Sequence, residues 1–563
     1  MKLPSSPSWL KHPRWWALLA IGLWLGHAVT TMALLPDWGI LPIAAAWLGL
    51  GWLLRWGAPD DDTTSPRRVW PWSLVPLCLW GVYVYLTESF GIVELGAIFF
   101  HLQAGMQGHG GISRSLAAIS YTLSMLALLA AFVWLVRHDH RWRRIELLLA
   151  VVLLASNPLI YGVGQRSASI VTDDGAWLDR HYQPPSIEQA PDEPPNLLVL
   201  YLESIERTYA DRERFGDAYA FLEALGDRGH VFEGVRQLEN TGWTMAGMIA
   251  SQCGTPLMPA GLLHDRQLEP LERVVPGIQC LGDVLAEEDY RLSFLGGAST
   301  DFAGKGIFYE DHGFDRILGR DELLPRLEDP EYVNDWGLFD DSLYDFTIEE
   351  IRRLDEEAEG PWGVVNLSLT GHAPNGYPAR ACEERQGEPD DEEDILYSVE
   401  CSAWLAFDLV ERLETEGLLD DTLVVIASDH LTMRVSAWEQ LVADERDNTF
   451  MLLGEGIEAG QRTHRESATI DLFPTILEAM GFTLEKRRAG LGVSLFAETP
   501  TLVEQHGLTD LAARMHEETA LQQRLWEGLV PEQARQEEPA TEAPEQVVET
   551  PEDTADEPAP DMQ

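Results

Sequence analysis

The sequence has little positive charge for its length. Its 563 residues include 40 Lys and Arg against 92 Asp and Glu, a formal net charge of -52 at pH 7, and only four residues are lysines (Lys2, Lys11, Lys305 and Lys486). So acidic a surface repels the phosphate backbone of nucleic acids, which excludes polynucleotide partners. The length excludes a single ordinary domain and favours two or three units.

Acidic residues are in turn scarce in the first 163 residues, which are rich in Trp, Leu, Ala and Val. We predict a transmembrane domain over 1–163, because five apolar runs there each have roughly the 20 residues that a helix needs to cross a bilayer. The runs are 15–35, 38–56, 69–87, 115–136 and 144–163. The first lacks a small-residue cleavage site, which favours an anchor over a signal peptide. Segment 91–103 is apolar but short, and we interpret it as interfacial or re-entrant.

Basic residues are nearly absent from every second loop, since 36–38 and 88–114 contain only Arg114. The positive-inside rule then places the N-terminus in the cytoplasm, and five spans place everything after residue 163 outside. A sixth crossing by 91–103 would invert this topology. The basic residues on the cytoplasmic side are Lys2, Lys11, Arg14, Arg55, Arg67, Arg68, Arg137, Arg141, Arg143 and Arg144.

Cysteine is also sparse, and aromatic residues are absent from the last part of the chain. Of five cysteines, Cys78 lies in the third predicted span, and the other four suggest Cys253–Cys280 and Cys382–Cys401 pairs by proximity. The sequence alone is compatible with three pairings or with none. Residues 531–563 contain eleven acidic residues, six prolines and no aromatics. Such a segment cannot form a core, so we expect 501–563 to be helical and then disordered.

The middle of the chain alternates short β-rich runs with helical stretches. After a polar linker over 164–192, this pattern predicts an α/β domain over 193–500 with a mostly parallel central sheet. The expected helices are 217–228, 339–358, 395–416 and 470–480. The expected strands are Asn196–Leu202, Arg291–Leu295, Val364–Leu369, Thr422–Ala427 and Thr449–Leu453.

Polar residues follow three of these strands, where ligands gather in such sheets. They are Glu203, His372 and the pair Asp429–His430, and Thr244 lies where a turn enters a helix. Taken singly, each has a structural interpretation: a helix cap, a turn residue or an N-cap. Together they predict a metal site, because oxygen ligands with one imidazole suit Mn²⁺, Mg²⁺ or Zn²⁺.

Six stretches in the same order identify a resemblance to the alkaline phosphatase/sulfatase superfamily, in its lipoteichoic acid synthase and phosphoglycerol transferase I branch. The resemblance covers roughly residues 195–495, and the five predicted spans also match that branch. The stretches are NLLVLYLES (196–204), ENTGWTMAGMIASQCGTPL (239–257), FAGKGIFYEDHGFD (302–315), NLSLTGHAPNGYP (366–378), ASDH (427–430) and TIDLFPTILEAMGF (469–482).

The resemblance implies one divalent cation, with Mn²⁺ expected first, bound by Glu203, Thr244, Asp429 and His430. Thr244 would be the nucleophile that takes phosphoglycerol from phosphatidylglycerol, or another phospholipid donor, and passes it to a periplasmic glucan or related glycan. His372 would contact substrate and assist proton transfer. Lys305 would contact the phosphate, although related enzymes often have Arg there; a surface lysine is the alternative.

Two departures from the superfamily narrow the chemistry. Sulfatases need Cys or Ser in a Cys-x-Pro-x-Arg context, whereas Cys253-Gly-Thr-Pro256 has another spacing and no Arg, which argues against sulfate esters. A second metal would need further ligands, and His312 and His464 do not complete a convincing set. Thr241 is a second threonine near the expected nucleophile; the resemblance, and not the spacing, favours Thr244.

We therefore expect a multi-pass protein of the bacterial inner membrane with its catalytic domain in the periplasm. The alternatives are a phosphoethanolamine transferase, which would carry more zinc-binding histidines, a phosphodiesterase that releases glycerol phosphate to water, and a non-catalytic membrane scaffold that retains the fold.

Overall fold

The computed structural model describes residues 175–259, 271–358, 360–389 and 394–529, together with Tyr83 and Phe100. Its centre is an eight-stranded sheet in the order β5-β4-β6-β2-β7-β8-β3-β9. β8 is antiparallel to both of its neighbours, and the other pairs are parallel. The sheet strands are β2 (Asn196–Leu202), β3 (His230–Arg236), β4 (Arg291–Gly296), β5 (Arg316–Leu318), β6 (Trp362–Leu367), β7 (Thr422–Ser428), β8 (Phe450–Leu453) and β9 (Gln461–Ala468). The expected mostly parallel α/β sheet is confirmed.

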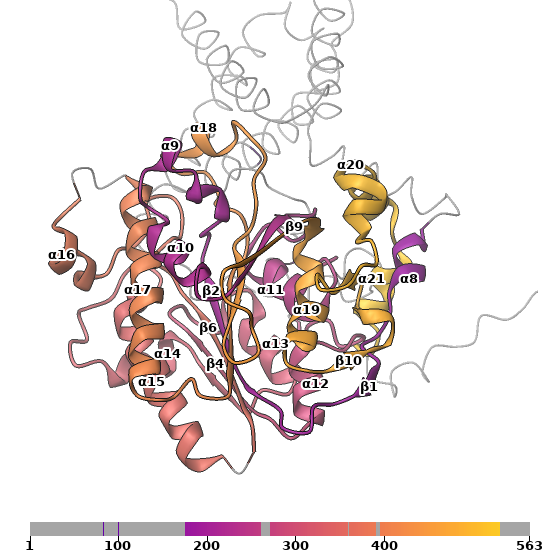
Figure 1. Cartoon of the computed structure of the whole chain (residues 1–563), viewed down its shortest axis with the longest axis horizontal. Coiled ribbons are helices and arrows are strands. Elements are labelled where there is room, and N and C mark those ends of the chain that lie inside the picture. Colours follow the sequence, from indigo (N-terminus) through magenta and orange to yellow (C-terminus); the bar gives the residue numbers. More distant parts are fainter. Residues whose placement is uncertain are drawn as a thin grey trace, which may run out of the picture.

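Helices cover both faces of this sheet (Figure 1). One side carries α10, α15 and α17, and the other carries α11, α12, α13 and α19. The helices are α8 (Trp177–His181), α9 (Arg212–Phe215), α10 (Ala220–Gly226), α11 (Thr244–Cys253), α12 (Leu281–Glu287), α13 (Lys305–Asp311), α14 (Arg320–Leu323), α15 (Asp340–Glu357), α16 (Arg380–Gln386), α17 (Ile395–Thr415), α18 (Trp438–Leu441), α19 (Leu472–Ala479), α20 (Leu502–Glu517) and α21 (Ala520–Leu525).

The apolar pattern of β2 explains this layering. Successive side chains of a strand point to opposite faces, and Leu197, Val199 and Tyr201 join one apolar core while Leu198, Leu200 and Leu202 join the other. A strand buried on both faces reads as a continuous apolar run, which is why its bounds match the predicted Asn196–Leu202.

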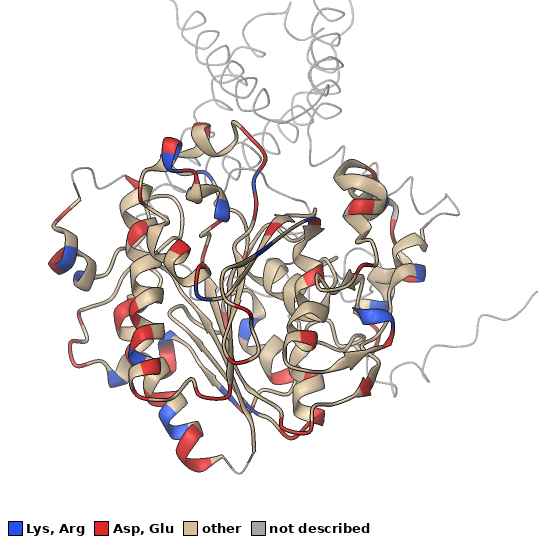
Figure 2. Ribbon diagram, viewed as in Figure 1, with Lys and Arg blue, Asp and Glu red and all other residues tan. Residues whose placement is uncertain are grey.

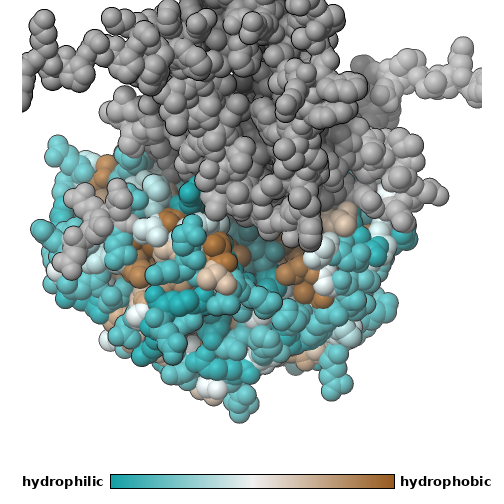
Figure 3. Space-filling view, turned by 90° about the horizontal axis from the view of Figure 1, so that it is seen from above, coloured by the Kyte–Doolittle hydropathy of each residue, from teal (hydrophilic) through white to brown (hydrophobic). Residues whose placement is uncertain are grey.

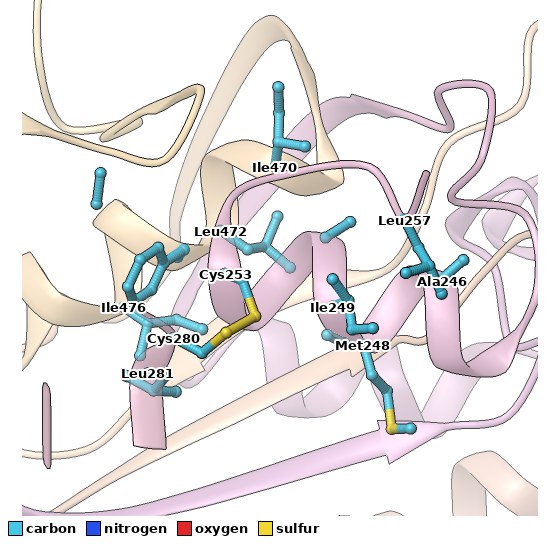
Figure 4. Close-up of a cluster of buried hydrophobic side chains, with 14 of the residues drawn as sticks. Ala246, Met248, Ile249, Cys253, Leu257, Cys280, Leu281, Ile470, Leu472 and Ile476 are labelled. Carbon is cyan, nitrogen blue, oxygen red and sulfur yellow. A yellow bond between two sulfur atoms is a disulfide. The ribbon is translucent and has the colours of Figure 1, made fainter. Parts of the chain in front are cut away.

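Helix α11 is almost entirely enclosed, since every residue from Met245 to Cys253 is buried. It packs against α19 and the 3₁₀ turn Thr469–Asp471, and Figure 4 shows Met248 and Ile249 among the side chains of this core. A disulfide joins Cys253, the last residue of α11, to Cys280, the N-cap of α12 (Figure 4). A second disulfide joins Cys382 and Cys401, so both pairings suggested by proximity are confirmed.

The structure corrects several predicted boundaries. Residues 177–189, expected within a polar linker, form α8 and the short strand β1 (Ile187–Gln189), which pairs with β10 (Thr483–Leu484). A fully buried Leu178 anchors α8 to the domain. At the other end, α20 and α21 contribute Leu511 and Leu525 to the apolar core, so the domain continues past residue 500. β6 starts and ends two residues earlier than predicted. A further small hairpin consists of β11 (Arg488–Ala489) and β12 (Gly492–Val493).

The surface of the domain is strongly acidic, with Asp and Glu spread over the helices on both sides of the sheet (Figure 2). Viewed from above, a mostly hydrophilic surface is interrupted by separate hydrophobic groups (Figure 3). None of the helices within the described ranges is both long and apolar enough to cross a membrane. Apart from Tyr83 in the third span, the five predicted spans lie outside the described residues, as does the segment 531–563 that is predicted to be disordered.

We predict that each disulfide stabilises the domain measurably. Cross-links that close loops of 27 and 19 residues should each contribute about 3 kcal/mol by restricting the unfolded chain. The variants C253S/C280S and C382S/C401S should both unfold at a lower temperature than the unaltered protein in a thermal unfolding experiment. An unchanged unfolding temperature in either variant would contradict this, with intact-mass analysis as the control that the cross-link is lost.

Candidate metal and nucleophile site

The carboxyl ends of three neighbouring strands meet at one edge of the sheet. Glu203 follows β2 directly, Asp429 and His430 follow β7, and His372 lies on the loop after β6. β2 and β7 are paired in register up to Leu202 and Ser428, so Glu203 and Asp429 leave the sheet side by side. The structure thus brings these predicted residues together.

Glu203, Asp429 and His430 form a buried group of possible metal ligands. Their ligand atoms all lie within 4.8 Å of one another. His430 Nε2 is 3.3 Å from Glu203 Oε1 and 3.3 Å from Asp429 Oδ2. Nδ1 of the same ring lies 2.8 Å from the carbonyl oxygen of Leu431. A carbonyl oxygen can only accept a hydrogen bond, so Nδ1 carries the proton. The lone pair on Nε2 is then available to a metal ion beside the two carboxylates.

Two buried atoms in this group lack a hydrogen bond, which supports a cation at this place. Asp429 Oδ2 and His430 Nε2 are both buried without a hydrogen-bond partner, and buried polar atoms are rarely left so unless an ion or water completes them. Burial and the neighbouring Glu203 carboxylate raise the pKa of Asp429. Burial lowers the pKa of His430, but Asp429 and Glu203 outweigh it and raise that pKa. The donor set therefore fits one divalent cation.

Thr244 faces this group from the N-terminus of α11. Trp243 before it is extended, with φ −157° and ψ 157°, and the helix begins at Thr244. The Thr244 hydroxyl donates to Glu203 Oε2 at 3.3 Å. The N-terminus of a helix favours negative charge, so a phosphate or an alkoxide is stabilised here.

Thr241, the second threonine of this stretch, is hydrogen-bonded within the turn that precedes α11. Its hydroxyl donates to the carbonyl of Leu238 at 2.8 Å and accepts from the Leu238 N–H at 3.0 Å. It is fully buried. The geometry therefore leaves Thr244 as the threonine that faces the carboxylates.

The close approach of α11 to the end of β7 depends on Gly247. A Cβ at this position would lie 1.7 Å from the carbonyl oxygen of Asp429, a distance that no side chain can accept. Glycine thus lets the helix that carries Thr244 rest directly on the loop that carries Asp429 and His430.

Lys305 is the first residue of α13, the helix between β4 and β5 in the chain. It is 2% exposed, its Nζ donates to the Phe302 carbonyl at 3.0 Å, and it lies 4.7 Å above the Phe302 ring. Burial lowers the pKa of Lys305 to about 8, although Glu203 and Asp429 oppose the shift. The burial of Lys305 rules out the alternative of a surface lysine at this position.

His372 is half-buried and is held by its own loop. Its Nδ1 lies 2.8 Å from the carbonyl of Ala373, and its ring packs 4.5 Å from that of Trp336. Asp340, buried at the start of α15, accepts from the N–H groups of Leu369 and Thr370, both at 2.8 Å. Asp340 therefore fixes the His372 loop, and the Ala373 carbonyl orients the His372 ring through Nδ1.

Several supporting residues were missed in the sequence. The Ser204 N–H donates to Asp429 Oδ1 at 2.9 Å and its hydroxyl to Glu203 Oε1 at 3.1 Å, while its backbone has φ 60°. Glu206, fully buried, pairs with Arg446 and accepts from the Thr432 N–H at 2.8 Å. In the sequence, only their positions within or near the stretch 196–204 pointed to Ser204 and Glu206. No sequence motif pointed to Asp340.

The two histidines considered for a second metal lie elsewhere. His312 binds Asp283 at 2.6 Å and the Val274 carbonyl at 3.0 Å, beside a Cys280 that is already in a disulfide. The side chain of His464 is 62% exposed, near Glu233 and Glu466. Neither reaches the group around Glu203.

We predict that Asp429→Asn weakens Mn²⁺ binding at least about 100-fold, since even partners behind a ligand contribute 10- to 100-fold. Titration with Mn²⁺ followed by electron paramagnetic resonance measures this. Asp471→Asn is the matched control, because Asp471 is equally buried but binds only backbone N–H groups in the residues described. Equal Mn²⁺ affinities of the two variants would contradict the site.

The Mn²⁺ affinity of the unaltered protein should rise with pH. The pKa values of Asp429 and His430 are raised, so protons must leave these side chains before a cation binds.

Comparisons with known proteins agree with this arrangement. A sequence model of the sulfatase family matches residues 195–482. The chain is 31% identical over 432 residues to phosphoglycerol transferase I of Shigella flexneri, a match that covers 74% of this chain and 56% of that protein. Phosphoglycerol transferase I of Escherichia coli (strain SMS-3-5 / SECEC) gives the same identity and coverage. The chain thus spans about half the length of these curated relatives.

Solved structures with a similar fold include two bacterial proteins. One is a protein in the alkaline phosphatase superfamily from Vibrio parahaemolyticus, with 21% identity, a TM-score of 0.46, and coverage of 61% of this chain and 79% of that chain. The other is the lipoteichoic acid synthase LtaP from Listeria monocytogenes, with 19% identity, a TM-score of 0.44, and coverage of 57% and 81%. Since both TM-scores are below 0.5, the assignment rests on sequence. The chain belongs to the sulfatase family, in the branch of the alkaline phosphatase/sulfatase superfamily that contains phosphoglycerol transferase I.

Proposed function

We propose that this protein is a membrane-bound, metal-dependent phosphotransferase that moves glycerol phosphate from phosphatidylglycerol to a glycan through a covalent threonine ester. The observation that carries the proposal is the hydroxyl of Thr244, at a helix N-terminus, directed at Glu203 within a buried group of metal ligands. The similarity to phosphoglycerol transferase I supports the choice of transferred group. We expect Mn²⁺, with Mg²⁺ or Zn²⁺ as the alternatives.

The residues of the site divide the work of the first step. Glu203, Thr244, Asp429 and His430 would hold one divalent cation, which supplies positive charge to the nucleophile and to the phosphate. Lys305 adds a second positive charge for the phosphate oxygens. The Thr244 hydroxyl gives up its proton as Oγ forms the new bond to phosphorus. The bond from phosphorus to the diacylglycerol oxygen breaks, and that oxygen takes up a proton, so that the proton count is unchanged.

The second step reverses the roles. A hydroxyl of the glycan acceptor bonds to phosphorus and gives up its proton, while the Thr244 oxygen leaves and regains one. His372 Nε2 is suited to carry these protons, because Nδ1 of the ring is held by the Ala373 carbonyl. Water in place of the glycan would give the hydrolytic reaction instead.

The proposed location is the inner membrane, with the catalytic domain in the periplasm. The five predicted spans would hold the domain beside its lipid donor, and the two disulfides fit an oxidising compartment. A glycan acceptor in the periplasm would then reach the site from the water side.

The proposal is tested with full-length protein, labelled phosphatidylglycerol and Mn²⁺. We expect release of diacylglycerol and, by intact-mass and peptide analysis, a glycerol phosphate adduct on Thr244. Thr244→Ala should lose both by at least about 1,000-fold, because the nucleophile itself is removed, whereas Thr241→Ser should keep both. Absence of turnover and adduct in metal-loaded protein would overturn the phosphatidylglycerol assignment; an adduct from phosphatidylethanolamine would replace it with phosphoethanolamine transfer.

Lys305 gives a pH dependence with a defined sign. Because burial lowers its pKa to about 8, the ammonium loses its proton above that pH, and its attraction for phosphate disappears. We expect kcat/KM for the donor to fall above pH 8 in the unaltered enzyme, approaching tenfold per pH unit. Lys305→Arg stays protonated and should shift this decline by at least one pH unit; coincident profiles would contradict the role of Lys305.

A further inference from the structure

Phe100 lies far from the catalytic domain in sequence but belongs to its apolar core. It is fully buried and is part of the same cluster as α11 and the end of α21. Its ring centroid is 5.0 Å from that of Trp243 and 6.5 Å from that of Trp526. Aromatic pairs at such distances attract beyond the burial of their area. One side chain of the N-terminal half thus packs beside Trp243, in the turn that leads into Thr244. This turn, residues 240–243, is called the nucleophile turn below.

The partners of Phe100 are themselves fixed to the nucleophile turn. The indole N–H of Trp526 donates to the carbonyl of Met258 at 2.8 Å. The N–H of the preceding residue, Leu257, donates to the carbonyl of Asn240 at 3.0 Å. The two rings that contact Phe100, those of Trp243 and Trp526, are therefore linked to each other through the segments 240–243 and 257–258.

Trp243 connects these rings to the chemistry. It is the N-cap of α11, its carbonyl accepts from the Gly247 N–H at 2.9 Å, and the next residue is Thr244. Its side chain is 6% exposed, so its position depends on what packs against it. Removal of the Phe100 ring would leave a cavity against Trp243 and let the helix N-terminus shift.

We infer that Phe100 is a positioning residue for Thr244, which it reaches through Trp243. The inference rests on the proposed function, since it assigns Phe100 a part in placing the proposed nucleophile. Phe100 belongs to the apolar segment 91–103, between the third and fourth predicted spans. The N-terminal half then does more than hold the enzyme at the membrane: it supplies part of the support for the nucleophile. A displacement of about 1 Å at a reacting atom can cost about 100-fold in rate.

The contact is tested first without reference to activity. Full-length protein with p-benzoylphenylalanine at position 100 is irradiated, and the cross-linked peptides are identified by mass spectrometry. We expect links to the peptides that contain Trp243 or Trp526. The same probe at Leu508, which is 39% exposed on α20, is the control and should give neither link. Links from position 100 only to other peptides would overturn the inference.

Kinetics then separate positioning from stability. Phe100→Ala should lower kcat by about 10- to 100-fold with KM changed less than about threefold, and Phe100→Leu should recover most of the loss. Phe482→Ala is the matched control: it removes a ring buried in the same core, in the turn after α19, and should lower the unfolding temperature but keep kcat. Unchanged kcat in folded Phe100→Ala, or an equal loss in Phe482→Ala, would overturn the positioning role.

A second substrate distinguishes a failure of the proposed function from a failure of the positioning role. If the unaltered protein does not turn over phosphatidylglycerol, the same variants are compared with bis(4-nitrophenyl) phosphate, a diester that needs no lipid site. Loss of that activity in Phe100→Ala but not in Phe482→Ala would keep the positioning role while the donor is reassigned. Equal activities of the two variants would overturn it.

Discussion

Two carboxylates buried side by side are the constraint on which the rest of the site depends. The in-register pairing of β2 and β7 ends at Leu202 and Ser428, so Glu203 and Asp429 have no freedom to separate. Like charges in a buried place are costly unless positive charge or hydrogen bonds compensate them. His430, the Ser204 N–H and the helix N-terminus at Thr244 supply part of that compensation. A divalent cation would complete it.

The surrounding elements keep this unfavourable pair in place. Ser204 has a left-handed backbone, at φ 60°, which costs of order 1 kcal/mol or more for a residue other than glycine. The Thr432 hydroxyl donates to the Ser204 carbonyl at 2.6 Å, and Glu206 holds the Thr432 N–H. These hydrogen bonds connect the loop after β2 to the loop after β7 next to Glu203 and Asp429. They hold Ser204 in its strained backbone conformation beside the candidate metal site.

The sequence predicted those parts of the fold that depend on short-range pattern. The strand Asn196–Leu202 was found because it is buried on both faces, whereas β9, at the sheet edge, was missed. Its side chains from Gln461 to Glu466 are all polar and are exposed or half-buried, so the strand lacks an apolar run. α8 and α20 were misplaced relative to the domain because a few buried side chains, such as Leu178, decide their packing.

The candidate site was predictable to a similar extent. Strand ends and the ordered stretches identified Glu203, Thr244, His372, Asp429 and His430, and the structure brings them together. Ser204, Asp340 and Phe100 could not be found in this way, because their contacts join residues that no local pattern relates. The spacing of the site along the chain has its own consequence. Its parts extend from residue 203 to residue 430, so a partly synthesised chain that ends before Asp429 cannot yet assemble them. Binding of a cation would then follow folding of the whole α/β domain and would not guide its first steps.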